Sequence, residues 1–176
     1  MKKFFLYGSA VIIVAILITG IFAPKGIAVE RSVVIERPME LVFPFFASLK
    51  NQEQYSPWAA KDPKTIHTYT GIDCMVGSAH AWESNHPEVG KGRQEILEIK
   101  TNQEITTELK FIEPFEATSK AYYKFNSLDD ATQVIWGYEQ DYGFFQSIFM
   151  MFFDMDKILG ADFEKGLTKA KVILEE

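Results

Sequence analysis

The sequence predicts an α+β fold in which a curved antiparallel β-sheet packs against one long C-terminal helix. From residue 65 to residue 141, short segments rich in β-branched and aromatic residues alternate apolar and polar positions between turn-forming residues. No proline follows Pro114, and residues 146–174 repeat their apolar side chains at helical spacing. The expected order is one strand, two short helices, six strands and the long helix.

The N-terminal segment is predicted to lie outside this domain. Residues 4–23 form an uncharged apolar run that follows Lys2 and Lys3. A helix of about twenty residues spans the hydrocarbon core of a bilayer, which is about 30 Å thick. We therefore predict a single-pass membrane anchor through residues 4–23, with residues 1–26 as anchor and short linker. A cleavable signal peptide is the alternative.

The charges that flank this run favour a cytoplasmic N-terminus, with the domain on the outer, periplasmic or extracellular side. Lys2 and Lys3 lie before the run, whereas the basic residues after it are diluted by Glu30 and Glu36.

The predicted folded domain covers residues 27–176. Residues 27–36 are β-branched and predict the first strand. Pro38 then introduces a short helix over residues 39–48, because proline is tolerated in a first helical turn. A second helical turn is expected over residues 49–54, ending before Pro57. The remaining strands are expected at 65–69, 78–84, 93–100, 104–112, 118–126 and 132–141, with Gly, Asn, Asp and Pro in their connections.

The long helix has two features that break its amphipathic pattern. Asp156 falls at the centre of the apolar face, level with Phe163. Gly160 and Gly166 lie inside the helix, where each costs about 1 kcal/mol relative to alanine. Either Asp156 lies near a solvated end and the glycines allow close packing, or this face borders a cavity that contains Asp156.

Composition excludes several function classes. The net charge is −6, and residues 1–25 contain only lysines among the charged types, so the remainder carries −9. Such a domain has no basic surface for nucleic acid, and charge does not favour docking onto anionic lipid. Cys74 is the single cysteine, which excludes an intrachain disulfide and a cysteine-rich metal site. An aromatic content of 14% suggests an aromatic-lined interior.

Motifs for catalysis and cofactor binding are missing from the sequence. The spacing of His67, His80 and His86 matches no metal motif, and the sequence lacks a nucleophile elbow, a phosphate loop and a dinucleotide fingerprint. We therefore expect no metal and no cofactor, and we assign no catalytic residue.

Several short motifs together resemble a known superfamily. They are Ser56-Pro57-Trp58, Asp62-Pro63, Trp82-Glu83-Ser84-Asn85, Val89-Gly90-Lys91-Gly92 and the run from Gly160 to Leu167. In this order they resemble one branch of the START-like (SRPBCC) superfamily of polyketide cyclases/dehydrases and lipid-transport proteins, over residues 28–174. The resemblance implies a helix-grip fold, with a seven-stranded antiparallel sheet around the C-terminal helix and a hydrophobic cavity between them. Members bind hydrophobic small molecules or lipids, and some are enzymes.

Side chains on the expected inner faces are the candidates for such a cavity. Glu95 is a special case, because it either contacts the ligand or pairs with Arg93 at the end of a strand. The candidate ligand-binding residues are Trp58, His80, Trp82, Glu95, Phe111, Tyr123, Trp136, Asp156, Gly160 and Phe163.

The favoured hypothesis is a membrane-anchored domain that binds a hydrophobic small molecule or lipid in an internal cavity. The alternatives are a cyclase/dehydrase-type enzyme that uses Glu95, Asp156 or His80 as acid or base, and a tethered interaction module with a filled core. The sequence leaves the ligand and the oligomeric state open.

Overall fold

The computed structural model describes residues 2–176, with the side chains of residue 7 and residues 13–176. Helix α1 (Lys2–Phe22) leads into strand β1 (Gly26–Ile35). The helices α2 (Met39–Ala47), η1 (Leu49–Asn51), α3 (Gln52–Tyr55) and α4 (Pro57–Lys61) follow. The other strands are β2 (Ile66–Thr70), β3 (Ala79–Glu83), β4 (Lys91–Lys100), β5 (Glu104–Glu113), β6 (Ala117–Leu128) and β7 (Ala131–Asp141), and the chain closes with α5 (Phe144–Met150) and α6 (Met155–Glu175).

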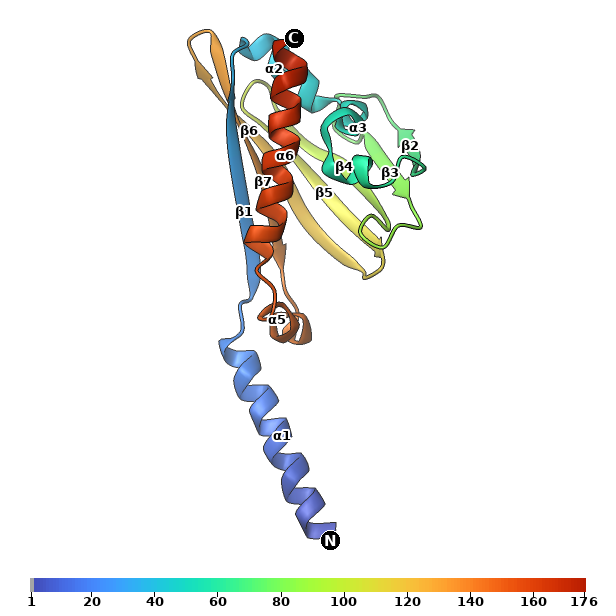
Figure 1. Cartoon of the computed structure of the whole chain (residues 1–176), viewed down its shortest axis with the longest axis vertical. Helices are drawn as coiled ribbons and strands as arrows, with labels where there is room; N and C mark the ends of the chain where they lie inside the picture. Colours follow the sequence, from blue (N-terminus) through green and yellow to red (C-terminus); the bar gives the residue numbers. More distant parts are fainter. Residues whose placement is uncertain (1) are drawn as a thin grey trace.

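The seven strands form one antiparallel sheet in the order β1-β7-β6-β5-β4-β3-β2. Consecutive strands from β2 to β7 pair with their neighbours, and β1 joins the sheet beside β7. Helix α6 crosses the sheet next to β1, and α3 and α4 lie beside it (Figure 1). These features confirm the predicted sheet and its partnership with a C-terminal helix.

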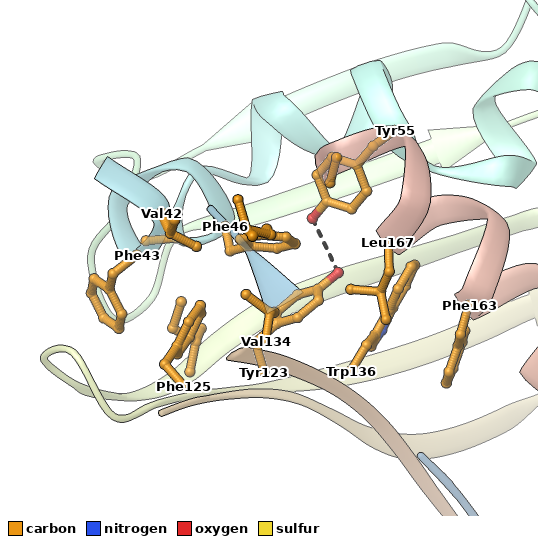
Figure 2. Packing of buried hydrophobic residues seen from close by; sticks show 14 of the residues in the cluster. Val42, Phe43, Phe46, Tyr55, Tyr123, Phe125, Val134, Trp136, Phe163 and Leu167 are labelled. Atoms are coloured by element: carbon orange, nitrogen blue, oxygen red, sulfur yellow. Dashed lines mark hydrogen bonds between the residues drawn. The ribbon is translucent and has the colours of Figure 1, made fainter. Parts of the chain in front are cut away.

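Aromatic side chains make up much of the core between the sheet and the helices. Phe43 and Phe46 of α2 pack against Phe125 of β6, and the ring of Trp136 of β7 stacks on that of Phe163 of α6 (Figure 2). The largest fully buried side chains include Tyr55, Phe46, Ile35 and Leu167. The apolar face of α6 therefore rests on a continuous aromatic core.

The prediction of one helix over residues 146–174 is wrong. The chain forms α5 and α6 with a break between them, and the backbone of Asp154 is not helical (φ −84°, ψ 78°). The Asp154 side chain accepts a hydrogen bond from the backbone N–H of Lys157 at 3.1 Å. Asp154 is therefore the N-cap of α6, a role that aspartate commonly takes.

The prediction that helical structure ends before Pro57 is also wrong. Pro57 opens α4, in which Trp58 lies in the first turn. A proline in the first turn loses no helical hydrogen bond, so Pro57 can begin a new helix directly after Ser56, the C-cap of α3. The consequence is that Trp58 is held on a helix at the edge of the core.

Within the part of the chain that the structure describes, no helix combines the length and the apolar character needed to cross a bilayer. The predicted anchor, residues 4–23, includes residues 4–6 and 8–12, whose side chains lie outside the described part.

Candidate functional site

A cavity of about 370 Å³ lies between the inner face of the sheet and the helices α3, α4, α5 and α6. Its walls are mainly aromatic and aliphatic. Trp58, Trp82, Phe111, Trp136 and Phe163 supply the aromatic surface. The aliphatic and small lining residues include Ala59, Val89, Leu109, Ala117, Ala121, Met150, Met155 and Leu159.

The wall on the α6 side is built around Trp136. Its indole stacks on the ring of Phe163, with centroids 4.4 Å apart and planes 9° apart, and it meets Trp58 edge-on at 6.2 Å. Gly166 makes this possible, because a Cβ there would lie 2.8 Å from the indole. The interior glycine thus lets α6 approach β7 closely, as one of the two sequence hypotheses expects.

Two neighbouring strands supply the other wall. Tyr69 of β2 lies directly opposite His80 of β3, and His67 lies opposite Trp82. Because paired residues of antiparallel strands share a face, all four side chains line the same side. Gly92 of β4 lies opposite Trp82, and a Cβ there would overlap the indole. The indole N–H of Trp82 donates to the carbonyl of Val89 at 3.3 Å.

The polar part of this wall is a histidine pair. Nδ1 of His67 lies 2.8 Å from Nε2 of His80, and the ring of Tyr69 stacks on His80 at 4.7 Å. Nδ1 of His80 is buried without a hydrogen-bond partner among the described residues. This favours the tautomer in which Nε2–H of His80 donates to His67, because a buried lone pair costs less than a buried N–H. Burial, reinforced by His67, lowers the pKa of His80 to about 4.

Other polar groups around the cavity make hydrogen bonds with other side chains or with the backbone. The Tyr69 hydroxyl donates to the carboxylate of Glu53, and burial raises the pKa of this tyrosine. The side-chain N–H of Gln94 donates to Thr107 at 3.0 Å, and the Thr107 hydroxyl donates to the carbonyl of Ala121 at 3.2 Å. The cavity therefore has mainly apolar walls, with the imidazoles of His67 and His80 on one side and Glu53 and Glu88 among the lining residues.

Six of the ten predicted residues line the cavity: Trp58, His80, Trp82, Phe111, Trp136 and Phe163. Tyr123 lies deeper, where its hydroxyl is 3.0 Å from that of Tyr55 (Figure 2). Both tyrosines are almost fully buried, so this contact belongs to the core.

The placement of Glu95 at the cavity is corrected by the structure. Glu95 pairs with Arg93 at 2.7 Å, and Gln94 and Ile96 point inward instead. The pairing of β4 with β5 shifts between Ile96 and Glu98. A shift of one residue exchanges the two faces of a strand, so Ile99 faces inward while Glu95 faces outward.

The placement of Asp156 and Gly160 at the cavity is likewise corrected. Asp156 is mostly exposed and accepts two hydrogen bonds from Arg31 of β1, at 2.9 and 3.1 Å. The Arg31 side chain also reaches Glu164 at 3.0 Å and passes over Gly160, where a Cβ would overlap its guanidinium group. The hydrogen bonds from Arg31 lower the pKa of Asp156. These residues fasten α6 to β1 outside the cavity.

Several lining residues were not among the predicted ones, notably His67, Gln94 and Leu159. His67 alternates with Tyr69 on a short strand, and this pattern could have identified it. Gln94 could not be found in this way, because the irregularity in β4 hides the true phase of the strand. Among the described residues, no group of three or more His, Cys, Asp or Glu side chains could hold a metal ion.

No family model matches the sequence, and no curated protein matches it. Solved structures do match the fold. An aromatase/cyclase, ZhuI, from Streptomyces sp. R1128 has a TM-score of 0.59 at 13% identity, covering 85% of this chain and 94% of its own. The chain has the helix-grip fold.

Two other solved structures agree with this assignment. The Aha1 dimer from Colwellia psychrerythraea has a TM-score of 0.58 at 10% identity, over 85% of this chain and 96% of its own. Ara h 8.0201 has a TM-score of 0.57 at 8% identity, over 85% of this chain and 97% of its own. At these identities the likeness concerns the helix-grip fold alone.

Proposed function

We propose that this helix-grip domain binds a hydrophobic small molecule or a lipid in its cavity, next to a membrane to which residues 4–23 tether it. The cavity itself carries the proposal. It measures about 370 Å³, within the range of about 300–1,000 Å³ that is usual for ligand pockets. Its aromatic and aliphatic walls favour an apolar ligand, since such walls gain free energy when water leaves them.

The polar groups of the cavity agree with an apolar ligand of limited polarity. His80 stays neutral at pH 7 because its pKa is about 4, so the wall offers no charge from this residue. The Gln94 amide and the Tyr69 hydroxyl already have protein partners. A ligand with one or two polar groups near His67 would suit this arrangement, whereas a highly charged ligand would lose hydration without compensation.

The support for a membrane tether comes from the sequence. Residues 4–23 are uncharged and long enough for a bilayer, and only Pro24, Lys25 and Gly26 separate them from the domain. A linker this short keeps the cavity close to the membrane surface. The flanking lysines favour a cytoplasmic N-terminus with the domain on the outer side.

A cyclase/dehydrase-type activity on a polyketide-like or other apolar substrate is the second candidate. It is supported by the histidine pair in the cavity wall and by the likeness to an aromatase/cyclase. His80 would position a substrate or exchange a proton with it through His67. Replacing His67 with Gln separates the two functions: catalysis predicts that turnover is lost while ligand binding remains.

Native mass spectrometry of the full chain in detergent tests ligand binding. Ala121 is buried in the cavity wall, so Ala121→Phe should fill the cavity and remove the bound lipophile. Ala28→Phe is the matched control, because Ala28 is exposed on β1. Wild type and the control should carry the same ligand, and Ala121→Phe should be empty. An empty wild type, or equal loading of all three proteins, would refute the proposal.

A further inference from the structure

A second apolar feature adjoins the wall of the cavity. The chain from Tyr142 to Phe153 contains no charged residue and five phenylalanines. Most of these rings are open to solvent: Phe145 is 78% exposed, Phe149 is 55% and Phe152 is 81%. The short helix α5 and the turn after it therefore expose aromatic surface that the core of the domain does not use. Contiguous surface of this kind on a folded domain marks an interaction site.

The apolar surface is continuous with the rim of the cavity. Gln146 and Met150 of α5 line the cavity, and so does Phe115 in the loop between β5 and β6. Phe115 is itself 78% exposed. We call Phe115, Phe145, Phe149, Phe152 and Phe153 the rim phenylalanines. Whatever covers these side chains therefore lies next to the part of the cavity wall that Phe115, Gln146 and Met150 form.

Helix α5 lies next to the C-terminal end of α1 (Figure 1). Phe144 at the start of α5 packs against Gly20 of α1, where a Cβ would overlap its ring. The backbone N–H of Tyr142 donates to the carbonyl of Lys25 at 2.7 Å, and the Lys25 ammonium donates to the carbonyl of Gly20 at 2.5 Å. These contacts hold α5 beside the last turn of α1, where Ile21 and Phe22 are also exposed.

We propose that α5 and the rim phenylalanines insert into the interfacial layer of a phospholipid bilayer, so that the mouth of the cavity opens onto lipid. Phenylalanine is a typical residue of the buried face of interfacial segments, and an uncharged stretch avoids the cost of placing ions there. The occupant is a bilayer because α5 is held beside the end of residues 4–23, the uncharged run of the sequence to which the proposed function assigns the tether. The inference rests on the proposed function, since the tether places α5 at the surface and the ligand explains an opening toward lipid.

Spin-label depth measurements on the full chain test this surface. Cys74→Ser first removes the single native cysteine. A nitroxide is then attached at Phe149→Cys, or at Leu128→Cys as the control, because Leu128 is exposed in the β6–β7 hairpin at the opposite end of the sheet. In phosphatidylcholine nanodiscs, label 149 should collide with oxygen more often than with a water-soluble nickel chelate, and label 128 should show the reverse. The same ratio in 1 M salt is expected, since no charge is involved.

Two outcomes overturn the proposal. If label 149 behaves like label 128, the rim phenylalanines lie in water. If label 149 is shielded from both reagents and shows spin–spin broadening, a second copy of the chain covers them instead.

A transfer assay separates this inference from the proposed function. Phe145→Asp together with Phe149→Asp changes only exposed side chains, and Ile72→Asp with Val76→Asp is the matched pair at exposed positions between β2 and β3. Uptake of a fluorescent lipid from phosphatidylcholine vesicles should slow by about tenfold or more in the first pair alone, since each phenylalanine loses its apolar burial. Affinity for the same lipid in detergent should not change. Failure of wild type to bind any lipophile defeats the proposed function, whereas equal uptake by both pairs defeats the membrane-facing rim.

Discussion

The guanidinium group of Arg31 on β1 donates two hydrogen bonds to the carboxylate of Asp156 in the first turn of α6, at 2.9 and 3.1 Å. The same side chain reaches Glu164 two turns later. One arginine thus fastens the start of α6 against the edge of the sheet. A carboxylate in the first turn also interacts favourably with the helix dipole.

Asp156→Asn should lower the thermal unfolding temperature without changing ligand binding. The lowered pKa of Asp156 in the folded state means that its carboxylate stabilises the fold. This stabilisation is fully present above the ordinary carboxyl pKa of about 4 and is lost as the pH falls through the lowered value. Thermal scans between pH 7 and pH 2 should therefore converge for wild type and variant at the acid end. Asp130→Asn, in the exposed β6–β7 turn, is the control. If Asp156→Asn alone lost the ligand, Asp156 would have to be a ligand-binding residue after all.

The effect of Gly160→Ala on the free energy of unfolding should change sign when the residue at position 31 is changed. In wild type the new methyl group overlaps the Arg31 guanidinium group and must displace it, so stability falls. In an Arg31→Ala background the space is empty, and alanine should stabilise the helix by up to about 1 kcal/mol. Urea unfolding of the four proteins measures both effects. An effect of the same sign in both backgrounds would show that Arg31 is not the reason for this glycine.

Tyr55→Phe should destabilise the domain by about 1–3 kcal/mol, because it leaves the buried hydroxyl of Tyr123 without its partner. The double variant Tyr55→Phe with Tyr123→Phe should be less destabilised than the sum of the two single variants, since no buried hydroxyl then remains unpaired. Chemical unfolding of the four proteins gives this coupling directly. Strict additivity would mean that the two hydroxyls do not interact.

His80 should make the domain less stable as the pH falls from about 6.5 to about 4. Above this range the imidazole is neutral in both states. Within it the unfolded chain binds a proton that the folded domain excludes, because the folded pKa is about 4. The loss should reach up to about 3 kcal/mol and then level off. His80→Gln should remove this step, whereas His86→Gln, outside the cavity wall, should keep it. An unchanged pH profile in His80→Gln would contradict this assignment.

The strand pattern could be predicted because alternation is a local property. Alternating residues such as Leu109 and Phe111, or Ala121 and Tyr123, identify a half-buried antiparallel sheet without reference to its neighbours. The aromatic cavity wall was predicted for a similar reason, since Trp82, Phe111 and Trp136 lie on apolar faces of predicted strands. The resemblance to helix-grip proteins then related the sheet to the last helix.

Other features depend on contacts between distant residues. Asp156 lies on the apolar side of the helix by periodicity, yet Arg31 draws it to the outer edge. Glu95 lies on the outer face of β4 instead of the predicted inner face, because the pairing of β4 with β5 is irregular. Neither effect leaves a trace in the local sequence, because each requires a partner from another strand.

The sequence by itself determined the succession of strands along the chain, the presence of a C-terminal helix and the uncharged runs at residues 4–23 and 142–153, because periodicity and charge are properties of short segments. Only the tertiary structure decided where the helix breaks, which side chains share the cavity and that α5 contributes to its wall. Those outcomes follow from packing: Asp154 caps α6, Gly166 admits Trp136, and Gly20 receives Phe144. The two glycine contacts join residues that are far apart in the chain, and the cap depends on a break in the helix. Neither can be read from the pattern of apolar and polar residues along the sequence.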